Sequence, residues 1–368
     1  MSTAAGDLGG DPMARALILA QLGRGRTSPN PMVGAVLTRD GSLVGEGHHA
    51  RAGSPHAEVV ALEQAGERAR GATLWVTLEP CCHTGRTGAC TKRLLEAGVS
   101  AVQVATLDPN PKVHGRGVAE LRAAGVAVSL GEREAEARAL IREFAVWVTQ
   151  GRPAVTLKIA MSLDGKVASA GGESQWITSE ASRARAHQLR SEHDAVMVGL
   201  GTVLADDPRL TARGVPQGFR QPLRVIVDSQ LRTPATARVL TTEGAPVVVA
   251  TTADAEPIRA RALSAAGAEL MTIPSVAGRV SLPDLLRQLG EREVLSLLVE
   301  GGPTLLGSFW GQRLGDRIAA FVAPLLLGGT AAPGPVGGQG AATLTDGWRL
   351  GPLRAEPLGA DLLLTAEV

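Results

Sequence analysis

Hydrophobic positions in the first 150 residues follow helix-like and strand-like spacings in turn. Apolar residues three to four apart predict a helix that begins at Asp11-Pro12 and runs to Leu22, with Asp11 as its N-cap. Two alternating apolar runs joined by Asp40-Gly41 predict a β-hairpin over 33–38 and 43–47. Further helices are expected at 56–70, 91–97, 117–124 and 132–149, with strands at 72–79, 101–107 and 126–130. This order predicts an α/β/α sandwich, with helices on both faces of a mixed sheet.

The pattern stops at the Gly-Pro-containing stretch 150–153 and then begins again. We therefore expect two domains, 1–150 and 151–368, which also suits a chain of 368 residues. In the second half, strands are expected at 155–161, 195–200, 223–228, 247–251, 270–273, 295–300, 318–327 and 362–366, and helices at 179–193, 257–266 and 283–290. This is a second α/β domain. The Gly/Pro/Ala-rich run 328–342 predicts a surface loop.

Composition narrows the classes of partner. The chain is 44% hydrophobic and 20% charged, as expected for a globular protein without membrane spans. A net charge of +1 and an aromatic content of 2% argue against nucleic acid, whose binding needs a basic groove and stacking platforms. Three cysteines do not make a disulfide framework, and no secretory signal is visible before Asp11. We expect a cytoplasmic protein with small-molecule partners, no nucleic acid and no membrane, and leave a homo-oligomer open.

The most informative stretch combines His56, Glu58, Cys81 and Cys90. A histidine followed two residues later by glutamate, and later by Pro-Cys and another cysteine, forms the zinc deaminase signature. One imidazole and two thiolates would hold Zn²⁺ in three tetrahedral positions and leave the fourth for water. Glu58 lies two positions after His56 on the expected helix, so the two side chains face different directions. Glu58 can therefore face the bound water and transfer its protons while His56 binds the metal. The alternative is that the cysteines are small buried hydrophobic residues.

More than one residue could bind zinc together with His56 and Cys81. Eight residues separate Cys81 from Cys90, where the signature has two, so Cys82 and His83 are rival ligands. Adjacent side chains rarely reach the same ion, which favours Cys81 with Cys90 and makes Cys82 a bystander.

A glycine pair after a predicted strand is a candidate phosphate site. Glu300-Gly301-Gly302-Pro303 passes from a strand end into a helix start, where backbone N–H groups and the helix dipole suit an anion. A tight turn explains the same glycines. Because neither a Gly-x-Gly-x-x-Gly nor a Walker motif is present, the residue pattern does not identify the cofactor.

Taken together, these motifs resemble the bifunctional deaminase/reductase family of riboflavin biosynthesis. The N-terminal resemblance rests on 29–34, His49, 56–58, 81–90 and 108–111, and the C-terminal one on 157–165, 172–178, 201–208, 227–229 and 300–304. That family also has eight residues between its cysteines. The sequence departs from the family's usual zinc loop at Cys82, Thr84 and Gly88-Ala89.

The resemblance implies a cytidine-deaminase-like α/β/α sandwich followed by a dihydrofolate-reductase-like α/β domain. The first would use Zn²⁺ to deaminate a diaminopyrimidine carrying a phosphoribosylamino group, with His56, Cys81 and Cys90 as ligands and Glu58 catalytic. The second would use NADPH to reduce the ribosyl group to ribityl. Implied deaminase substrate contacts are Asn30, His49, His83, Arg86 and Thr87. Implied NADPH contacts are Ala160, Trp176, Thr202, Asp206, Ser229 and Gly302. Implied reductase substrate contacts are Lys158, Ser174, Arg190, Leu210, Arg213 and Glu300.

Two alternative functions would each require residues that differ from those in this chain. A nucleic-acid deaminase would need more positive charge and more aromatic side chains than this chain has. A protein with purely structural zinc would need four protein ligands and no Glu58. For Arg190 and Arg213, a solvated surface position is the alternative to a substrate contact.

Overall fold

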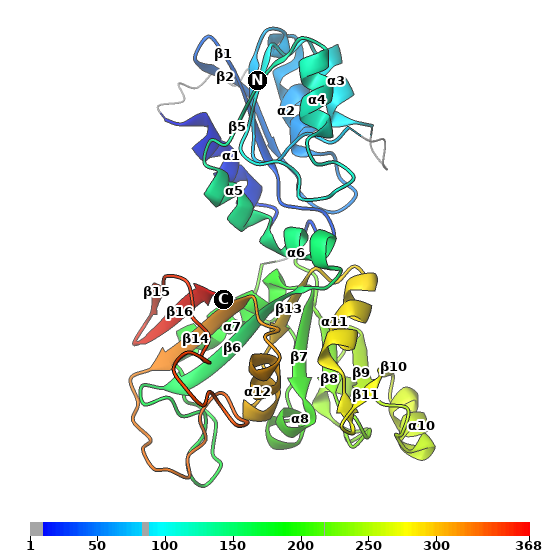
Figure 1. Cartoon of the computed structure of the whole chain (residues 1–368), viewed down its shortest axis with the longest axis vertical. Coiled ribbons are helices and arrows are strands. Elements are labelled where there is room, and N and C mark those ends of the chain that lie inside the picture. The colour runs from blue at the N-terminus through cyan, green and yellow to red at the C-terminus, as the bar shows by residue number, and fades with distance from the viewer. Residues whose placement is uncertain (1–9, 83–87, 217) are drawn as a thin grey trace. The chain divides into compact units, whose positions relative to one another are not determined.

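The computed structural model describes residues 10–82, 88–216 and 218–368. The chain divides into two compact units, Met1–Gly151 and Arg152–Val368 (Figure 1). Among the described residues, no helix is both long enough and apolar enough to cross a membrane.

Unit 1 is built on a five-stranded sheet in the order β2-β1-β3-β4-β5. The β1/β2 and β1/β3 pairs are antiparallel, whereas β3, β4 and β5 run parallel. Asp40 and Gly41 both have positive φ values, 51° and 77°, so the predicted hairpin turn is confirmed. The strands are β1 Gly34–Arg39, β2 Ser42–His48, β3 Thr73–Val76, β4 Ala101–Val104 and β5 Ala127–Leu130.

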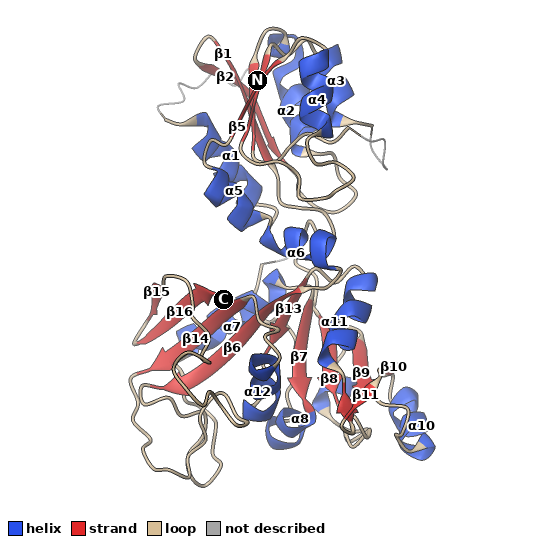
Figure 2. Ribbon diagram, in the orientation of Figure 1, coloured by secondary structure: helices blue, strands red, loops and turns tan. Residues whose placement is uncertain are grey.

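Helices cover both faces of this sheet, as the sequence pattern predicts (Figure 2). One apolar cluster packs α2, α3 and α4 against the sheet, and another packs α1 and α5 against the opposite face. Asp11 caps α1 by accepting hydrogen bonds from the Met13 and Ala14 N–H groups. The helices are α1 Pro12–Gln21, α2 Ala57–Ala65, η1 Gly66–Ala69, α3 Cys90–Glu96, α4 Arg116–Ala123, α5 Glu134–Leu140 and α6 Arg142–Gln150.

Helix α1 lies unusually close to β1 at Gly34. A Cβ atom at this position would meet the Ala16 carbonyl oxygen at 2.0 Å and the Ala20 nitrogen at 2.7 Å. Gly34→Ala should therefore destabilise unit 1 by about 1–3 kcal/mol or more, because backbone must move. Urea unfolding measures the loss. Gly88→Ala is the matched control, since its Cβ meets no atom of the described residues within 4 Å. An equal loss of stability in both variants would contradict the close-packing argument.

Unit 2 contains a nine-stranded sheet in the order β10-β9-β8-β7-β13-β6-β14-β16-β15. Every pairing from β10 to β14 is parallel, while β16 and β15 complete the sheet with antiparallel pairings. The strands are β6 Ala154–Ser162, β7 Ala195–Gly199, β8 Leu223–Val227, β9 Val247–Thr251, β10 Glu269–Thr272, β13 Ser296–Val299, β14 Arg317–Ala323, β15 Arg354–Leu358 and β16 Asp361–Glu367; a separate hairpin pairs β11 Ser275–Val276 with β12 Arg279–Val280.

Side chains of successive residues point to opposite faces of a strand, and in the central strands they belong to different apolar clusters. Both faces of this sheet are therefore covered. Leu297 and Val299 of β13 join the cluster that includes α11 and α12, whereas Leu298 packs with Leu189 of α7. The helices are α7 Glu180–Glu192, α8 Leu200–Asp206, α9 Arg238–Thr241, α10 Pro257–Ala265, α11 Leu282–Glu291 and α12 Pro303–Gly311.

The structure corrects several element boundaries. The single helix expected over 132–149 is two helices, α5 and α6, because Ile141 at φ −104° interrupts the helical geometry. The strand expected over 318–327 ends at Ala323, since Pro324 follows and cannot donate a ladder hydrogen bond. Helices α8 and α9 and strands β11, β12 and β15 were not expected. Residues 324–353, which include the predicted loop, contain neither helix nor strand.

Candidate active sites

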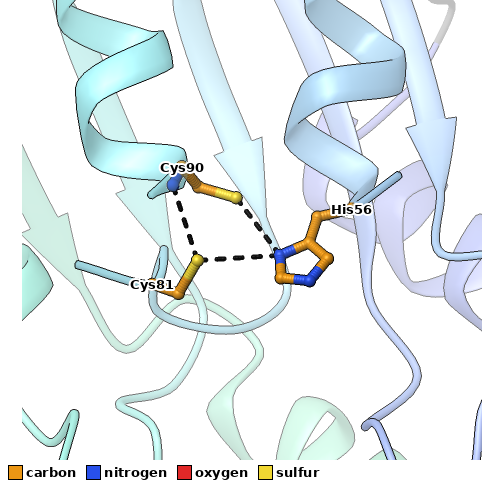
Figure 3. A group of neighbouring side chains, drawn as sticks. All are labelled: His56, Cys81 and Cys90. Carbon is orange, nitrogen blue, oxygen red and sulfur yellow. Dashed lines mark hydrogen bonds between the residues drawn. The ribbon is translucent and has the colours of Figure 1, made fainter. Parts of the chain in front are cut away.

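Three ligand-type side chains from distant parts of unit 1 converge at one point (Figure 3). His56 is the N-cap residue of α2, Cys90 is the first residue of α3, and Cys81 follows the end of β3. The sequence pattern placed His56 within the first helical turn, and the helix in fact begins one residue later. The ligand atoms of His56, Cys81 and Cys90 all lie within 4.8 Å of one another.

The spacing of these atoms fits a tetrahedral zinc ion. His56 Nδ1 lies 3.6 Å from Cys81 Sγ and 3.3 Å from Cys90 Sγ. Zinc bonds of about 2.0–2.1 Å to nitrogen and 2.3 Å to sulfur put such a pair about 3.6 Å apart across a tetrahedral angle. Cys82, by contrast, is half-buried and is not part of this group.

The electrostatics of the thiol pair also favour a cation. The hydrogen bond between the two thiols lowers the pKa of Cys81 and raises the pKa of Cys90, because one sulfur accepts the hydrogen that the other keeps. The pKa of His56 is raised by its hydrogen bond to Cys81. A divalent cation among the three side chains would displace these protons and let both sulfurs ionise.

Glu58 is a buried carboxyl group beside the thiols. It lies in the first turn of α2 and is 4% exposed. Burial and the nearby charge of Cys81 raise its pKa. A carboxyl group in this setting can hold a proton as well as release one, which is what a proton shuttle requires.

Asn30 and His49 lie next to this group. The rings of His49 and His56 meet edge to face, with centroids 5.5 Å apart. His49 Nδ1 is 3.1 Å from the Pro55 carbonyl oxygen, so this nitrogen carries the proton and Nε2 accepts from the Asn30 amide at 3.0 Å. Burial lowers the pKa of His49, which keeps the imidazole neutral. The remaining predicted contacts of this site, His83, Arg86 and Thr87, lie outside the described residues.

Glu79 is a structural feature of this site that the sequence interpretation left without a role. Its carboxylate is 3% exposed and accepts hydrogen bonds from the N–H groups of Asp108, Gly115 and Val118 at 2.9–3.1 Å. It thereby ties the segment next to Cys81 to the loop 108–115 and to the first turn of α4. A glutamate directly before the Pro-Cys pair, after an apolar strand, is the signal that could have revealed it.

In unit 2, predicted site residues gather at the carboxyl ends of parallel strands, where ligands of such sheets bind. Ala160 is near the end of β6, Thr202 and Asp206 are in α8 after β7, Ser229 follows β8, and Glu300 follows β13.

Glu300 is the centre of a charged group. It is 7% exposed and receives two hydrogen bonds from Arg190, from Nε at 2.6 Å and from Nη2 at 2.9 Å, while Lys158 Nζ lies 3.6 Å away. Burial opposes ionisation of Glu300, but Arg190 and Lys158 outweigh it and lower its pKa to about 2. Arg190 is only 14% exposed, so it is not a solvated surface residue. The group keeps net positive charge, which suits an anionic substrate.

A second group lies at the start of α12. The Gly302 N–H donates to Thr202 Oγ1 at 3.2 Å, and Ser174 Oγ donates to Asp206 at 3.1 Å. Gly302 is the N-cap residue and has no side chain to accept from the first-turn N–H groups of α12. A Cβ atom at Gly302 would meet only Thr202 Oγ1, at 3.7 Å. Pro303 has no N–H, and the N–H groups of Gly302 and Leu305 already donate to Thr202 Oγ1 and to the Gly302 carbonyl oxygen. The feature that fits a dinucleotide phosphate is therefore the open space beside Gly302 at the positive end of the α12 dipole.

Five predicted contacts have no direct hydrogen bond or ion pair to these groups among those seen in the described residues. One of them, Arg213, is exposed and donates to Thr211 Oγ1, so the surface position named as its alternative is the one it takes here. Trp176 is 70% exposed, with the Arg183 guanidinium 4.7 Å from its ring centroid. Ser229 Oγ accepts from the Val280 N–H, and Ala160 packs against an apolar cluster. Leu210 is 1% exposed and its side chain belongs to the core, so a substrate could reach only its backbone.

The site in unit 1 defines a class of protein: a zinc-dependent hydrolytic deaminase, here joined to a second α/β unit with a cationic site. Residues 11–106 match the family described as cytidine and deoxycytidylate deaminase zinc-binding region, and residues 153–364 match the RibD C-terminal domain.

Relatives match along nearly the whole chain. The riboflavin biosynthesis protein RibD of Aquifex aeolicus is 46% identical over 352 residues, covering 96% of each chain, and that of Escherichia coli is 44% identical over 332 residues, covering 87% of this chain and 88% of the relative. Two solved structures cover 97% of each chain: Acinetobacter baumannii RibD, with 39% identity and a TM-score of 0.87, and a diaminohydroxyphosphoribosylaminopyrimidine deaminase/5-amino-6-(5-phosphoribosylamino)uracil reductase from Thermotoga maritima, with 37% identity and a TM-score of 0.84.

The chain belongs to the RibD family of riboflavin biosynthesis proteins. It is a bifunctional enzyme, a deaminase and a reductase that acts on small molecules and uses Zn²⁺ and NADPH. The predicted fold class, a cytidine-deaminase-like sandwich followed by a reductase domain, is confirmed.

Proposed function

We propose that residues 1–150 form the deaminase domain and residues 151–368 the reductase domain, and that each carries a complete active site. The deaminase would remove an exocyclic amine from a phosphoribosylated diaminopyrimidine, and the reductase would convert the ribosyl group of the product to ribityl. The observation that carries the deaminase assignment is the convergence of His56, Cys81 and Cys90 beside the buried carboxyl group of Glu58.

In the deaminase, His56, Cys81 and Cys90 would hold the zinc. When bound, zinc supplies a Lewis acid that makes water nucleophilic near neutral pH. Glu58 would take one proton from the attacking water and pass it to the ring nitrogen, and would then carry the second proton of that water to the departing ammonia. The burial of the Glu58 carboxyl group beside the ligand-type side chains suits this double role. Asn30 and His49, held by their mutual hydrogen bond, orient the pyrimidine.

In the reductase, the start of α12 would hold a phosphate of NADPH, with Ala160, Trp176, Thr202, Asp206 and Ser229 as further cofactor contacts. NADPH supplies the hydride for the ribosyl carbon. Arg190 and Arg213 would bind the substrate phosphate, with Ser174, Glu300 and the Leu210 backbone as neighbours. Lys158, held 3.6 Å from Glu300, is the ammonium placed to give a proton to the reduced substrate.

A reducing compartment suits the deaminase site. All three cysteines are free, and Cys81 and Cys90 can bind a metal only as thiolates. We therefore propose that the protein works in the cytoplasm, where thiols stay reduced.

Product analysis tests the two assignments. The full chain is incubated with the phosphoribosylated diaminopyrimidine, first alone and then with NADPH. We expect ammonia and the deaminated uracil in the first incubation, and the ribityl product with NADPH oxidation in the second. Ammonia release without any subsequent NADPH oxidation would contradict the reductase assignment.

Gly302 offers a test of the cofactor site. Gly302→Leu should weaken NADPH binding by about tenfold or more, because the side chain would occupy the space where the backbone meets the phosphate. The fold should tolerate the change, since the nearest atom to a Cβ is 3.7 Å away and φ is −71°. NADPH fluorescence titration measures the affinity. Gly311→Ala, at the other end of α12 with open space, is the control, and unchanged affinity in Gly302→Leu would exclude this phosphate position.

A further inference from the structure

His187 lies beside the charged group of unit 2 without belonging to the residues assigned above. It is in α7, three residues before Arg190, so the two side chains share one face of the helix. His187 Nδ1 is 3.1 Å from the carbonyl oxygen of Thr211, and Arg190 Nη1 donates to the same oxygen at 3.2 Å. Two side chains of α7 thus meet one backbone carbonyl of a neighbouring segment.

That segment, 209–213, is neither helix nor strand and is shaped by side-chain contacts. Leu210 has φ of 56° and anchors its side chain in the core. Ala212 exchanges two hydrogen bonds of 2.8 Å with the Gln221 amide, and Arg213 Nη1 donates to Thr211 Oγ1 at 3.1 Å. The segment therefore carries Arg213, and its Thr211 carbonyl is the point at which α7 holds it.

The chemistry of the contact defines the state of His187. A carbonyl oxygen only accepts, so Nδ1 carries the hydrogen. Burial, followed by the charges of Arg190 and Arg213, lowers the pKa of His187 to about 4, although Glu300 and the Thr211 carbonyl oppose the shift. His187 is thus a neutral donor at physiological pH. A lysine here would add another cation beside Arg190 and Arg213, at a cost in repulsion.

We propose that His187 is a positioning residue of the reductase, whose Nδ1–H bond to the Thr211 carbonyl holds segment 209–213 so that Arg213 meets the phosphate of the substrate. This inference rests on the proposed substrate site. His187 itself does not touch the reacting atoms, and its Nε2 is not needed for the role.

Three variants of His187 distinguish the role of Nδ1 from that of Nε2. Asparagine places an amide N–H where His187 has Nδ1, glutamine places it nearer the position of Nε2, and leucine removes both. We expect His187→Leu and His187→Gln to raise the KM for the phosphoribosylaminouracil about tenfold, the value of one lost hydrogen bond, with kcat changed less than about threefold. His187→Asn should stay within about threefold of wild type in both constants. Steady-state loss of NADPH absorbance at varied substrate measures them.

Internal controls exist in the same chain. The deamination rate and the KM for NADPH should be unchanged in all three variants, because neither site includes His187. If His187→Leu fails to fold, His187→Gln, which keeps a polar side chain of similar size, decides the matter. A fall in kcat at unchanged KM, or an asparagine variant as impaired as the leucine variant, would overturn the positioning role.

Arg213→Met separates this inference from the proposed function on which it rests. If Arg213→Met leaves the substrate KM unchanged, the proposed substrate site is wrong. If Arg213→Met raises KM while His187→Leu and His187→Gln do not, the site stands and only the role of His187 is wrong. A rise in KM for Arg213→Met, His187→Leu and His187→Gln, with the asparagine variant near wild type, supports both.

Discussion

Deamination by the Glu58→Gln variant should be slower than wild type by at least about 10²- to 10⁴-fold. Glu58 is 4% exposed, lies against the thiol pair, and is the carboxyl group that the proposed mechanism uses for more than one proton transfer. Glutamine keeps the shape of the side chain but cannot take a proton. Ammonia release from the diaminopyrimidine substrate measures the loss.

The same variant tests whether the two activities are chemically independent. Zinc content should be unchanged, and reduction of the pre-formed deaminated substrate should proceed at the wild-type rate, as followed by stopped-flow loss of NADPH absorbance. Glu63→Gln is the matched control, because Glu63 is on the same helix but exposed, and it should leave both activities intact. A folded, zinc-loaded Glu58→Gln protein with an equally impaired reductase would mean that the two reactions share one active site.

Cys90→Ser should reduce zinc from about one ion per chain to a tenth or less, and deamination should fall with it, because a hydroxyl group is a far poorer zinc ligand than a thiolate. Cys90 is fully buried, with Sγ 3.3 Å from His56 Nδ1. Metal analysis by mass spectrometry after gel filtration measures the ion. The reductase should keep its activity.

Cys82→Ser is the control for this prediction. Cys82 is half-buried and outside the group of three ligand-type side chains, so its variant should retain zinc and deaminase activity. Loss of metal in Cys82→Ser together with retention in Cys90→Ser would reverse the ligand assignment.

Local sequence was sufficient for the features that depend on neighbouring residues. Asp11 caps α1 and Asp40-Gly41 turns the first hairpin, because capping and turn geometry are decided within a few positions. Periodicity likewise predicted most helices and strands, but it missed the break at Ile141, where no glycine or proline marks the end of a helix.

The zinc site was predictable from sequence because its residue types and order are distinctive. What the motif left open was which thiol accompanies Cys81. The structure brings Cys90, at the start of α3, to His56 and leaves Cys82 outside the group, which supports Cys90 as the proposed ligand.

Contacts between distant segments that no motif marks depended on the tertiary structure. Arg190 and Glu300 are 110 positions apart, and no local pattern indicates that they form a buried ion pair. The same holds for Glu79, whose partners lie in the loop 108–115 and the first turn of α4, and for His187 of α7, which meets Thr211 in the segment 209–213. The sequence by itself determined most of the helices and strands, because these follow from residues close together in the chain, and it indicated the proposed zinc ligands, because their residue types and order form a distinctive motif. Only the tertiary structure decided which charges are paired and which polar groups are buried, because burial and pairing depend on the segments that the fold brings together.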